Sequence, residues 1–464
     1  MKTLLAAFLH YLAQLRQKLT RGWSHFWFTP SAPTTLATIR IACGLILLYV
    51  HVTTYHQLLN FVGPDAWVDD TAVAQIKEHP NNIARSLEGR QLEPDLDKND
   101  IIERNRWYRL TIWEYVRDPL WIRVIHAGFI LAMLCFTVGL GTRVATVLAW
   151  YGHLSYIQRG YTIWFGMDSM ILFITFYLMF APCGWALSFD RLIARYRAIR
   201  RSGRGKEALG DAPPLPMHWS ATTLTRMIQI HMGIVYLCSG LAKLQGQTWW
   251  NGYATWMTMQ TSEFALVDMR WLGHLPFWLW NGVSTLTTYA TLAFEIGFIF
   301  LIWYPFWRPI FLFGAVALHA GIGFFMGLVS FGLIMLTGCM SYISPAGMEW
   351  FLAALFGGPR NLLFRFSRHD AAGLQQATLL KTLDVWNRIV FVDAADAGHG
   401  GALEVPSSGK TYRGKGILIG GFARLPSLWL TLPVALVAFP GGGAATTNAR
   451  PTSRLMGQEQ TAKK

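Results

Sequence analysis

The chain has 464 residues, of which 53 % are hydrophobic and only 14 % are charged. Soluble domains carry roughly 25 % charged residues, so this composition excludes an ordinary soluble protein and indicates an integral membrane protein. The net charge of +14 comes from basic residues in short segments between apolar runs. That placement is typical of orientation signals and anionic-lipid contacts, so we expect membrane lipids as partners and no nucleic acid.

Residues 1–29 combine leucines at helical spacing with the basic residues Arg16, Lys18 and Arg21. These charges interrupt the apolar core that a secretory signal needs, so the segment is not typical of a signal peptide. We expect an amphipathic helix lying on the cytoplasmic surface of a membrane.

Seven apolar runs follow, and a spanning helix needs about 20 apolar residues. They cover 34–60, 121–141, 144–160, 165–187, 223–244, 281–304 and 309–343. The last run is too long for one ordinary helix and contains Gly321, Gly323 and Gly327, so we expect a tight helical hairpin there. The sequence therefore predicts an α-helical, polytopic integral membrane protein with about seven or eight transmembrane helices.

The distribution of charge predicts the orientation of these helices. Segment 189–220 is rich in Arg and Lys and should be cytoplasmic, whereas the connection 61–120 has more acidic than basic residues and should face outward. Four spans separate the basic segment from the N-terminus. We therefore expect a multi-pass protein of the cell membrane with its N-terminus and C-terminus in the cytoplasm.

One apolar run ends in a face that carries polar and ionisable side chains. Tyr236, Ser239, Gly240 and Lys243 follow one another at spacings of three, one and three, so they share one side of a helix. Lys243 lies at the outer end, where its ammonium group could extend to the lipid headgroups as a simple anchor. The alternative is a functional group in a polar cavity.

Other ionisable residues also fall inside apolar runs. Asp168 opens the fourth run, Glu295 lies in the sixth and His319 in the seventh. Each alone can be explained by a hydrogen bond between helices, but charged groups in spans usually face a protein cavity. A lysine in such a cavity could act as a general base. Together with Lys243, these residues favour one polar cavity over four separate contacts, and we expect them to meet there.

The five cysteines stand singly in apolar stretches, and no pair has the spacing of a metal site or a redox pair. We therefore expect no metal. Their apolar surroundings indicate small buried side chains.

These segments resemble the horizontally transferred transmembrane (HTTM) family, which is similar to the membrane region of vitamin K-dependent γ-carboxylase. The resemblance covers about 30–345. It is carried by the stretch Leu36–Gly44 with Arg40, Arg159 through Asp168 to Pro182, Tyr236–Leu244 with Trp250 and Gly252, and Glu295–Gly297 followed by Arg308–Ile310 and His319.

The resemblance implies that Lys243 in the pair Lys243-Leu244 is a base acting on a reduced quinone, similar to vitamin K hydroquinone, at the outer membrane face. Arg40, Asp168, Tyr236, Glu295 and His319 would support catalysis or bind the substrate. Two features depart from the carboxylase: Gly160-Tyr161 stands where that enzyme has Asn-His, and its large extramembrane C-terminal portion is missing.

The C-terminal part changes to a soluble character over about 360–440, where short apolar strands alternate with a helix in an α/β pattern. It resembles the DCC family of thioredoxin-like domains, whose signature is Asp-Gly-x-Cys-x-x-Cys. One candidate stretch runs from Asp370 and puts Gly373 and Gln376 at the cysteine positions; the other follows Asp393 and puts Asp396 and His399 there. No cysteine follows Cys339, so dithiol exchange is excluded in this domain. Residues 441–464 should be disordered.

Two functions remain open from the sequence. The first is a membrane-embedded enzyme, carboxylase-like (a carbon–carbon lyase) or otherwise quinol-dependent, acting on a lipid or quinol-type substrate. The second is a non-catalytic membrane protein whose polar cavity binds lipid or a protein partner. A proton-coupled carrier is a further, weaker reading, because acids and histidines within spans also build proton relays.

Overall fold

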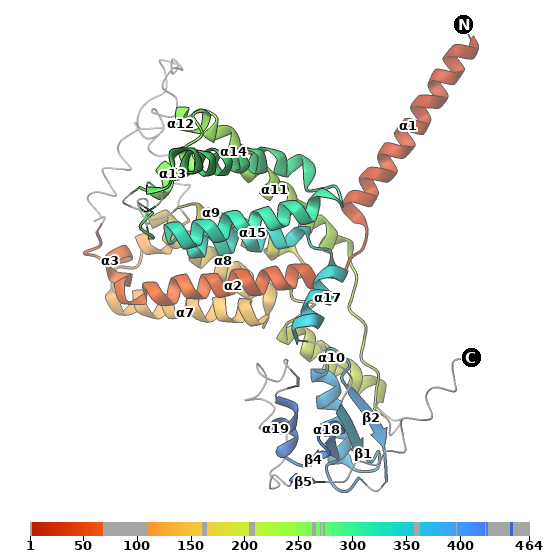
Figure 1. Cartoon of the computed structure of the whole chain (residues 1–464). Helices are drawn as coiled ribbons and strands as arrows, with labels where there is room; N and C mark the ends of the chain where they lie inside the picture. The colour runs from red at the N-terminus through yellow and green to blue at the C-terminus, as the bar shows by residue number, and fades with distance from the viewer. Residues whose placement is uncertain are drawn as a thin grey trace. The chain divides into compact units, whose positions relative to one another are not determined.

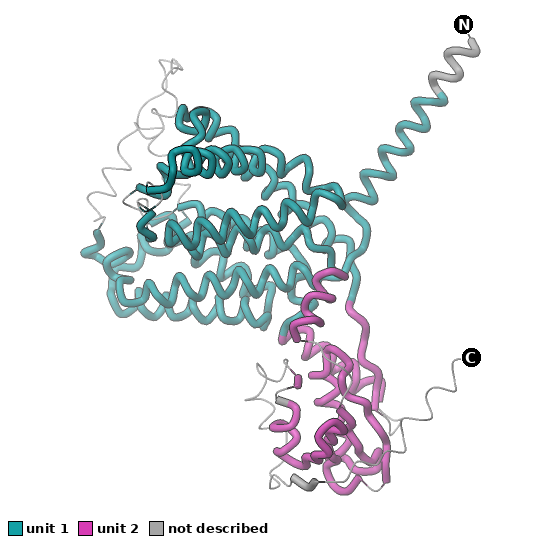
Figure 2. Tube along the Cα trace, viewed as in Figure 1, with its two compact units in different colours: residues 1–188, 216–345 teal, residues 189–215, 346–464 magenta. Residues whose placement is uncertain are grey.

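A computed structural model of the chain describes residues 2–67, 110–159, 165–203, 209–261, 266–269, 271, 274–356, 362–395, 397–422, 424–425 and 446–448. The chain divides into two compact units, shown in Figure 2. Unit 1 comprises residues 1–188 and 216–345, and unit 2 comprises 189–215 and 346–464. Unit 2 therefore includes the basic segment 189–215, which the sequence had placed in the membrane domain.

Unit 1 is built from helices, most of which lie roughly side by side in Figure 1. Their bounds are α1 Lys2–Phe28, α2 Thr34–Thr54, η1 Tyr55–Gln57, α3 Leu58–Val62, η3 Ile112–Glu114, α7 Pro119–Val138, α8 Thr142–Arg159, α9 Gly166–Phe180, α11 Trp219–Lys243, α12 Gln247–Trp250, α13 Ala254–Met259, α14 Phe277–Leu301, α15 Trp307–Met326, α16 Val329–Cys339 and η5 Met340–Tyr342. Helices α2, α7, α8 and α9 pack on one another, as do α11, α14, α15 and α16, and α9 and α16 join the two groups.

Within the described residues, four stretches of helix are long and apolar enough to cross a membrane: Thr34–Val62, Pro119–Val138, Phe277–Leu301 and Trp307–Met326. Gly166–Phe180 and Val329–Tyr342 are shorter apolar helices. The expected helical hairpin is present as α15 and α16. The chain reverses at Gly327, whose φ of 71° lies in the left-handed region that glycine enters without steric cost.

The N-terminal segment is helical, as expected. Leu19 and Trp23 of α1 are exposed, while the end of the helix is fixed to α11: the guanidinium of Arg226 lies 4.5 Å from the ring centre of Phe26, and Thr223 donates a hydrogen bond to the Trp27 carbonyl.

Unit 2 contains a mixed sheet with strand order β2-β1-β3-β4-β5. The strands are β1 Leu362–Phe366, β2 Ile389–Asp393, β3 Ala402–Val405, β4 Lys410–Tyr412 and β5 Thr446–Asn448, with helices α10 Phe189–Gly203, α17 Pro345–Phe356, α18 Ala371–Leu383 and α19 Gly416–Phe422. Strands β1 and β2 are parallel and joined through α18, whereas the other pairs are antiparallel. Strand β5 lies in the stretch 441–464, which was expected to be disordered. It is ordered as a strand because its backbone pairs with the open edge of β4.

The basic segment predicted to be a cytoplasmic loop forms α10, and one of its arginines has a structural role. Arg195 is buried and donates hydrogen bonds to the carbonyl oxygens of Lys381, Thr382 and Asp384 at 2.8, 3.1 and 3.0 Å. These carbonyls are at the C-terminus of α18, where a helix has no backbone donors left and the dipole favours a cation.

Candidate functional site

The polar face predicted on α11 packs against α14. At Gly240 a Cβ atom would lie 2.7 Å from Cγ1 of Ile296 and 3.2 Å from Cβ of Glu295. Glycine at this position therefore allows the two helices to approach closely, as small residues do between packed helices in membranes. That approach places the Glu295 carboxylate beside the last turn of α11, where Lys243 is located.

Lys243 and Glu295 form an ion pair at the edge of the helix bundle. Nζ of Lys243 is 2.9 Å from Oε1 and 2.8 Å from Oε2 of Glu295, and it donates to Oγ of Ser239 at 2.6 Å. The Glu295 side chain is 7 % exposed and that of Lys243 is 24 % exposed, so the carboxylate is the more deeply buried partner. Nζ also lies 5.4 Å from the ring centre of Trp249. The lysine is thus held by the protein, and simple snorkelling does not describe its contacts.

Both members of the ion pair line a cavity of about 780 Å³. Its walls come mainly from α13, α14, α15 and the connection to α16, and they are mostly apolar and aromatic, with Trp256, Trp271, Trp280, Phe294 and Phe331 among them. A few hydroxyl groups face it, including those of Thr255 and Thr287, which are 2.8 Å apart. An apolar cavity with one charged pair and a few hydroxyls suits an amphipathic molecule with a polar group at one end.

Tyr236 and His319 meet behind this wall. The Tyr236 hydroxyl is 2.7 Å from Nε2 of His319 and 3.4 Å from Sγ of Cys339, and both the tyrosine and the histidine are buried. The Tyr236 ring packs edge-on against Phe294, and the His319 ring packs against Phe331. Neither polar side chain lines the cavity, whereas Phe294 and Phe331 do. A direct contact of Tyr236 or His319 with a bound molecule therefore requires these rings to move.

Asp168 and Arg40 lie apart from the cavity. Asp168 is in the first turn of α9, where Oδ2 accepts a hydrogen bond from the backbone N–H of Phe165, and Oδ1 lies 3.6 Å from Nε2 of His153. Arg40 is fully buried on α2 and donates to the carbonyl oxygens of Cys183 and Leu187 at 2.5 and 2.6 Å. Its guanidinium therefore fixes the turn that follows α9.

Sequence reasoning missed a cluster of histidines around Asp168. His51, His126 and His153 are all buried, on α2, α7 and α8. Three histidines in three apolar runs were the available signal, but nothing in their sequence spacing shows that the helices bring them together.

Comparisons of the chain with protein-family models, with curated proteins and with solved structures find no match. Among the residues that the structure describes, no group of three or more His, Cys, Asp or Glu side chains is placed to hold a metal ion.

Proposed function

We propose that unit 1 is a membrane-embedded enzyme that binds a lipid or quinol-type molecule in the cavity and uses Lys243 as a base. The observation that carries the proposal is the position of Lys243 in the cavity wall, in contact with Glu295 and Ser239. The tryptophan side chains of the wall suit a flat aromatic ring, and the apolar remainder suits a hydrocarbon tail. A reduced quinone would supply an acidic hydroxyl group at the polar end.

The ion pair supplies a route for the proton. Before reaction, the Lys243 ammonium can transfer one proton to the Glu295 carboxylate over 2.8 Å, which leaves an amine and a carboxylic acid. Burial penalises the two charges of an ion pair, so the neutral pair becomes accessible once a bound molecule displaces water from the cavity. The amine then takes the proton from a hydroxyl group of the substrate, and the resulting ammonium stabilises the oxyanion.

The helices support a polytopic arrangement with more spans than the four that qualify by length and apolar character. We include α8 and α11, which are about 27 and 37 Å long at 1.5 Å per residue, and the shorter α9 and α16, which pack within the bundle. With α15 and α16 as a hairpin, this gives eight helices. The N-terminus and unit 2 would then lie on the cytoplasmic side.

For unit 2 we propose a thioredoxin-type domain of the DCC kind that has lost its redox chemistry. The parallel β1-α18-β2 unit next to the antiparallel β3 and β4 supports this assignment. The stretch from Asp370 begins α18 directly after β1, where the cysteine motif would stand. The second candidate stretch lies beside the first, because Nδ1 of His399 is 3.0 Å from Oδ1 of Asp370. Asp396 lies outside the described residues.

A second function is favoured by the ion pair itself. In this second function Glu295 keeps Lys243 protonated, so that its ammonium group binds the polar group of a lipid and does not act as a base. Unit 1 would then be a lipid- or partner-binding protein without catalysis, with the same cavity as its binding site.

The substitution Lys243→Arg separates the two functions. Arginine keeps the positive charge and can still pair with Glu295, but it cannot release its proton near neutral pH. We expect the variant to insert normally, to retain co-purified lipid or quinone, and to lose all quinol-dependent turnover in proteoliposomes supplied with a reduced naphthoquinone. Lys18→Arg, on the exposed side of α1, is the matched control and should keep the wild-type rate.

Identification by mass spectrometry of the lipid or quinone that co-purifies with the wild type completes the test. Full turnover by Lys243→Arg would exclude the base role. A wild-type protein that retains the ligand through the Lys243–Glu295 pair and never turns it over would establish the binding function.

A further inference from the structure

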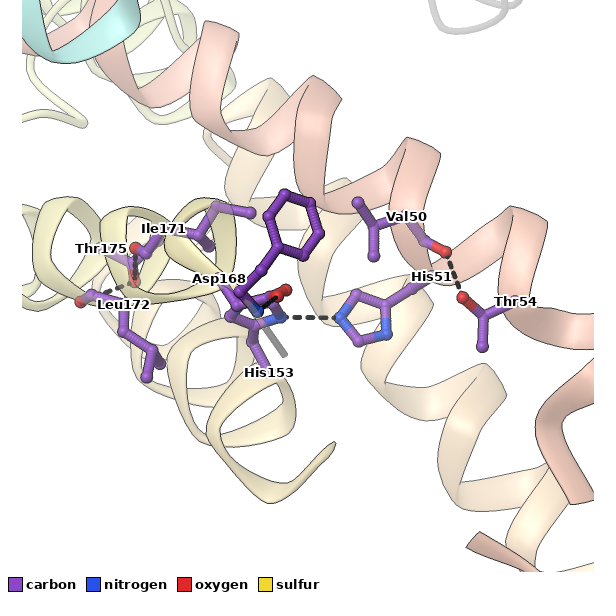
Figure 3. A network of polar contacts seen from close by, with 9 residues as sticks. Val50, His51, Thr54, His153, Asp168, Ile171, Leu172 and Thr175 are labelled. Carbon is purple, nitrogen blue, oxygen red and sulfur yellow. Dashed lines mark hydrogen bonds and ion pairs between the residues drawn. The ribbon is translucent and has the colours of Figure 1, made fainter. Parts of the chain in front are cut away.

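The histidine cluster around Asp168 is separate from the cavity and has its own polar geometry. In Figure 3 the imidazoles of His51 and His153 point toward one another, with Asp168 beside His153. Nε2 of His51 is 3.1 Å from Nδ1 of His153, and Nε2 of His153 is 3.6 Å from Oδ1 of Asp168. Three helices, α2, α8 and α9, thus contribute one continuous row of titratable groups.

The net charge of these three buried groups favours the binding of one additional proton. Two neutral imidazoles and one carboxylate carry one net negative charge, and His51 and His153 are only 3 % and 2 % exposed. A buried charge is costly unless an opposite charge compensates it. One additional proton makes the row neutral, because it leaves an imidazolium next to a carboxylate.

The geometry also indicates where this proton binds. Nε2 of His153 lies 3.6 Å from Oδ1 of Asp168 and makes no hydrogen bond to the described residues, whereas Nδ1 of the same ring shares a hydrogen bond with Nε2 of His51. A proton added at Nε2 of His153 makes this ring the imidazolium, next to the carboxylate of Asp168. No other bond forms or breaks, and the row changes from one negative charge to neutral.

A second set of groups leads from this row to the surface. The ring of His51 lies 4.7 Å from that of Tyr156, whose hydroxyl is 2.5 Å from Nδ1 of His126. The His126 ring stacks on Tyr55, which is exposed at the end of α2. Among the described residues, His126 of α7 and Tyr156 of α8 are the titratable groups whose rings lie beside His51, and Tyr55 of η1 lies against His126. Arg159, which is also buried, follows on α8.

We propose that His51, His153 and Asp168 form a buried proton-binding site that exchanges one proton with the surface past Tyr156, His126 and Tyr55. The site does not depend on the role of Lys243. It differs from a purely structural contact between helices, because such a contact needs the hydrogen bond between the imidazoles but not the additional proton.

Solid-state NMR of the full chain, labelled with ¹⁵N-histidine and reconstituted in lipid bilayers, tests the site. At about pH 6, we expect one coupled pair of imidazoles that contains a single charged ring. His51→Gln and His153→Gln assign the pair by removing its coupled signals. His56→Gln, on the exposed η1 segment, should leave the pair unchanged.

The deciding variant is Asp168→Asn. Its amide oxygen can still accept the hydrogen bond from Phe165 at the start of α9, so the helix end is preserved while the negative charge is removed. We expect the imidazole pair to remain coupled but to lose its charged ring at the same pH. A pair that stays charged in Asp168→Asn, or rings that show no coupling in the wild type, would refute the proton site.

Discussion

The Lys243–Glu295 pair can be measured by a double-mutant cycle that replaces Lys243 with Met and Glu295 with Gln. Methionine keeps the unbranched stem of lysine, and glutamine keeps the shape of glutamate, so packing changes little. Charges 2.8 Å apart attract by about 6 kcal/mol at an effective dielectric constant of about 20. Desolvation of the carboxylate offsets a large part of this attraction.

Removal of one partner leaves the other charge unpaired inside the protein. We therefore expect each single substitution to lower the free energy of unfolding by about 3 kcal/mol, with the larger loss in Lys243→Met because Glu295 is the less exposed partner. The double variant should cost no more than one single variant, which gives a coupling energy of about 3 kcal/mol.

The assay is reversible unfolding of the full chain in mixed micelles, followed by circular dichroism. The Lys381–Asp211 pair of unit 2 is the control, with 3.6 Å between Nζ and Oδ1 and a fully exposed aspartate. Its coupling energy should be below about 1 kcal/mol, as for other surface pairs. Additive losses at Lys243 and Glu295 would show that the two side chains do not stabilise each other, and the reasoning about the site would fail.

Other substitutions test unit 2 and the membrane orientation. Arg195→Met should destabilise unit 2 by about 2–3 kcal/mol in thermal unfolding, because three carbonyl groups lose a charged donor; a change near zero would contradict this. The N–H groups of Gly400 and Gly373 lower the pKa of Asp370, so Asp370→Ala should cost about 1 kcal/mol at pH 7, and this difference should shrink below about pH 4 as the wild-type carboxyl is protonated. A difference that did not depend on pH would argue against this role. The full chain should show no dithiol-dependent insulin reduction, and any such activity would contradict the redox-inactive assignment. A cysteine at Ser202 should not react with a membrane-impermeant reagent outside intact cells, and labelling there would overturn the orientation.

Local sequence patterns predicted the elements that depend on neighbouring residues along the chain. Apolar composition predicted the membrane class, and the spacing from Tyr236 to Lys243 predicted a shared face of α11, because a helix repeats every 3.6 residues. Gly321, Gly323 and Gly327 together indicated a hairpin, and the structure makes the turn at Gly327, because glycine enters the left-handed region without steric cost. In unit 2, the alternation of short apolar runs indicated an α/β pattern over about 360–440, and β1, α18 and β2 lie in this range.

The contacts between helices were decided only by the tertiary structure. Glu295 meets Lys243 because Gly240 lets α14 approach α11, whereas Asp168, equally acidic and equally placed in an apolar run, meets His153. Periodicity tells which residues share a face, but it contains no information about the rotation and axial shift of one helix against another. Side-chain packing between the helices sets those two quantities. For the same reason the basic composition of segment 189–220 predicted only a loop, whereas the structure forms α10 there and places Arg195 at the C-terminus of α18.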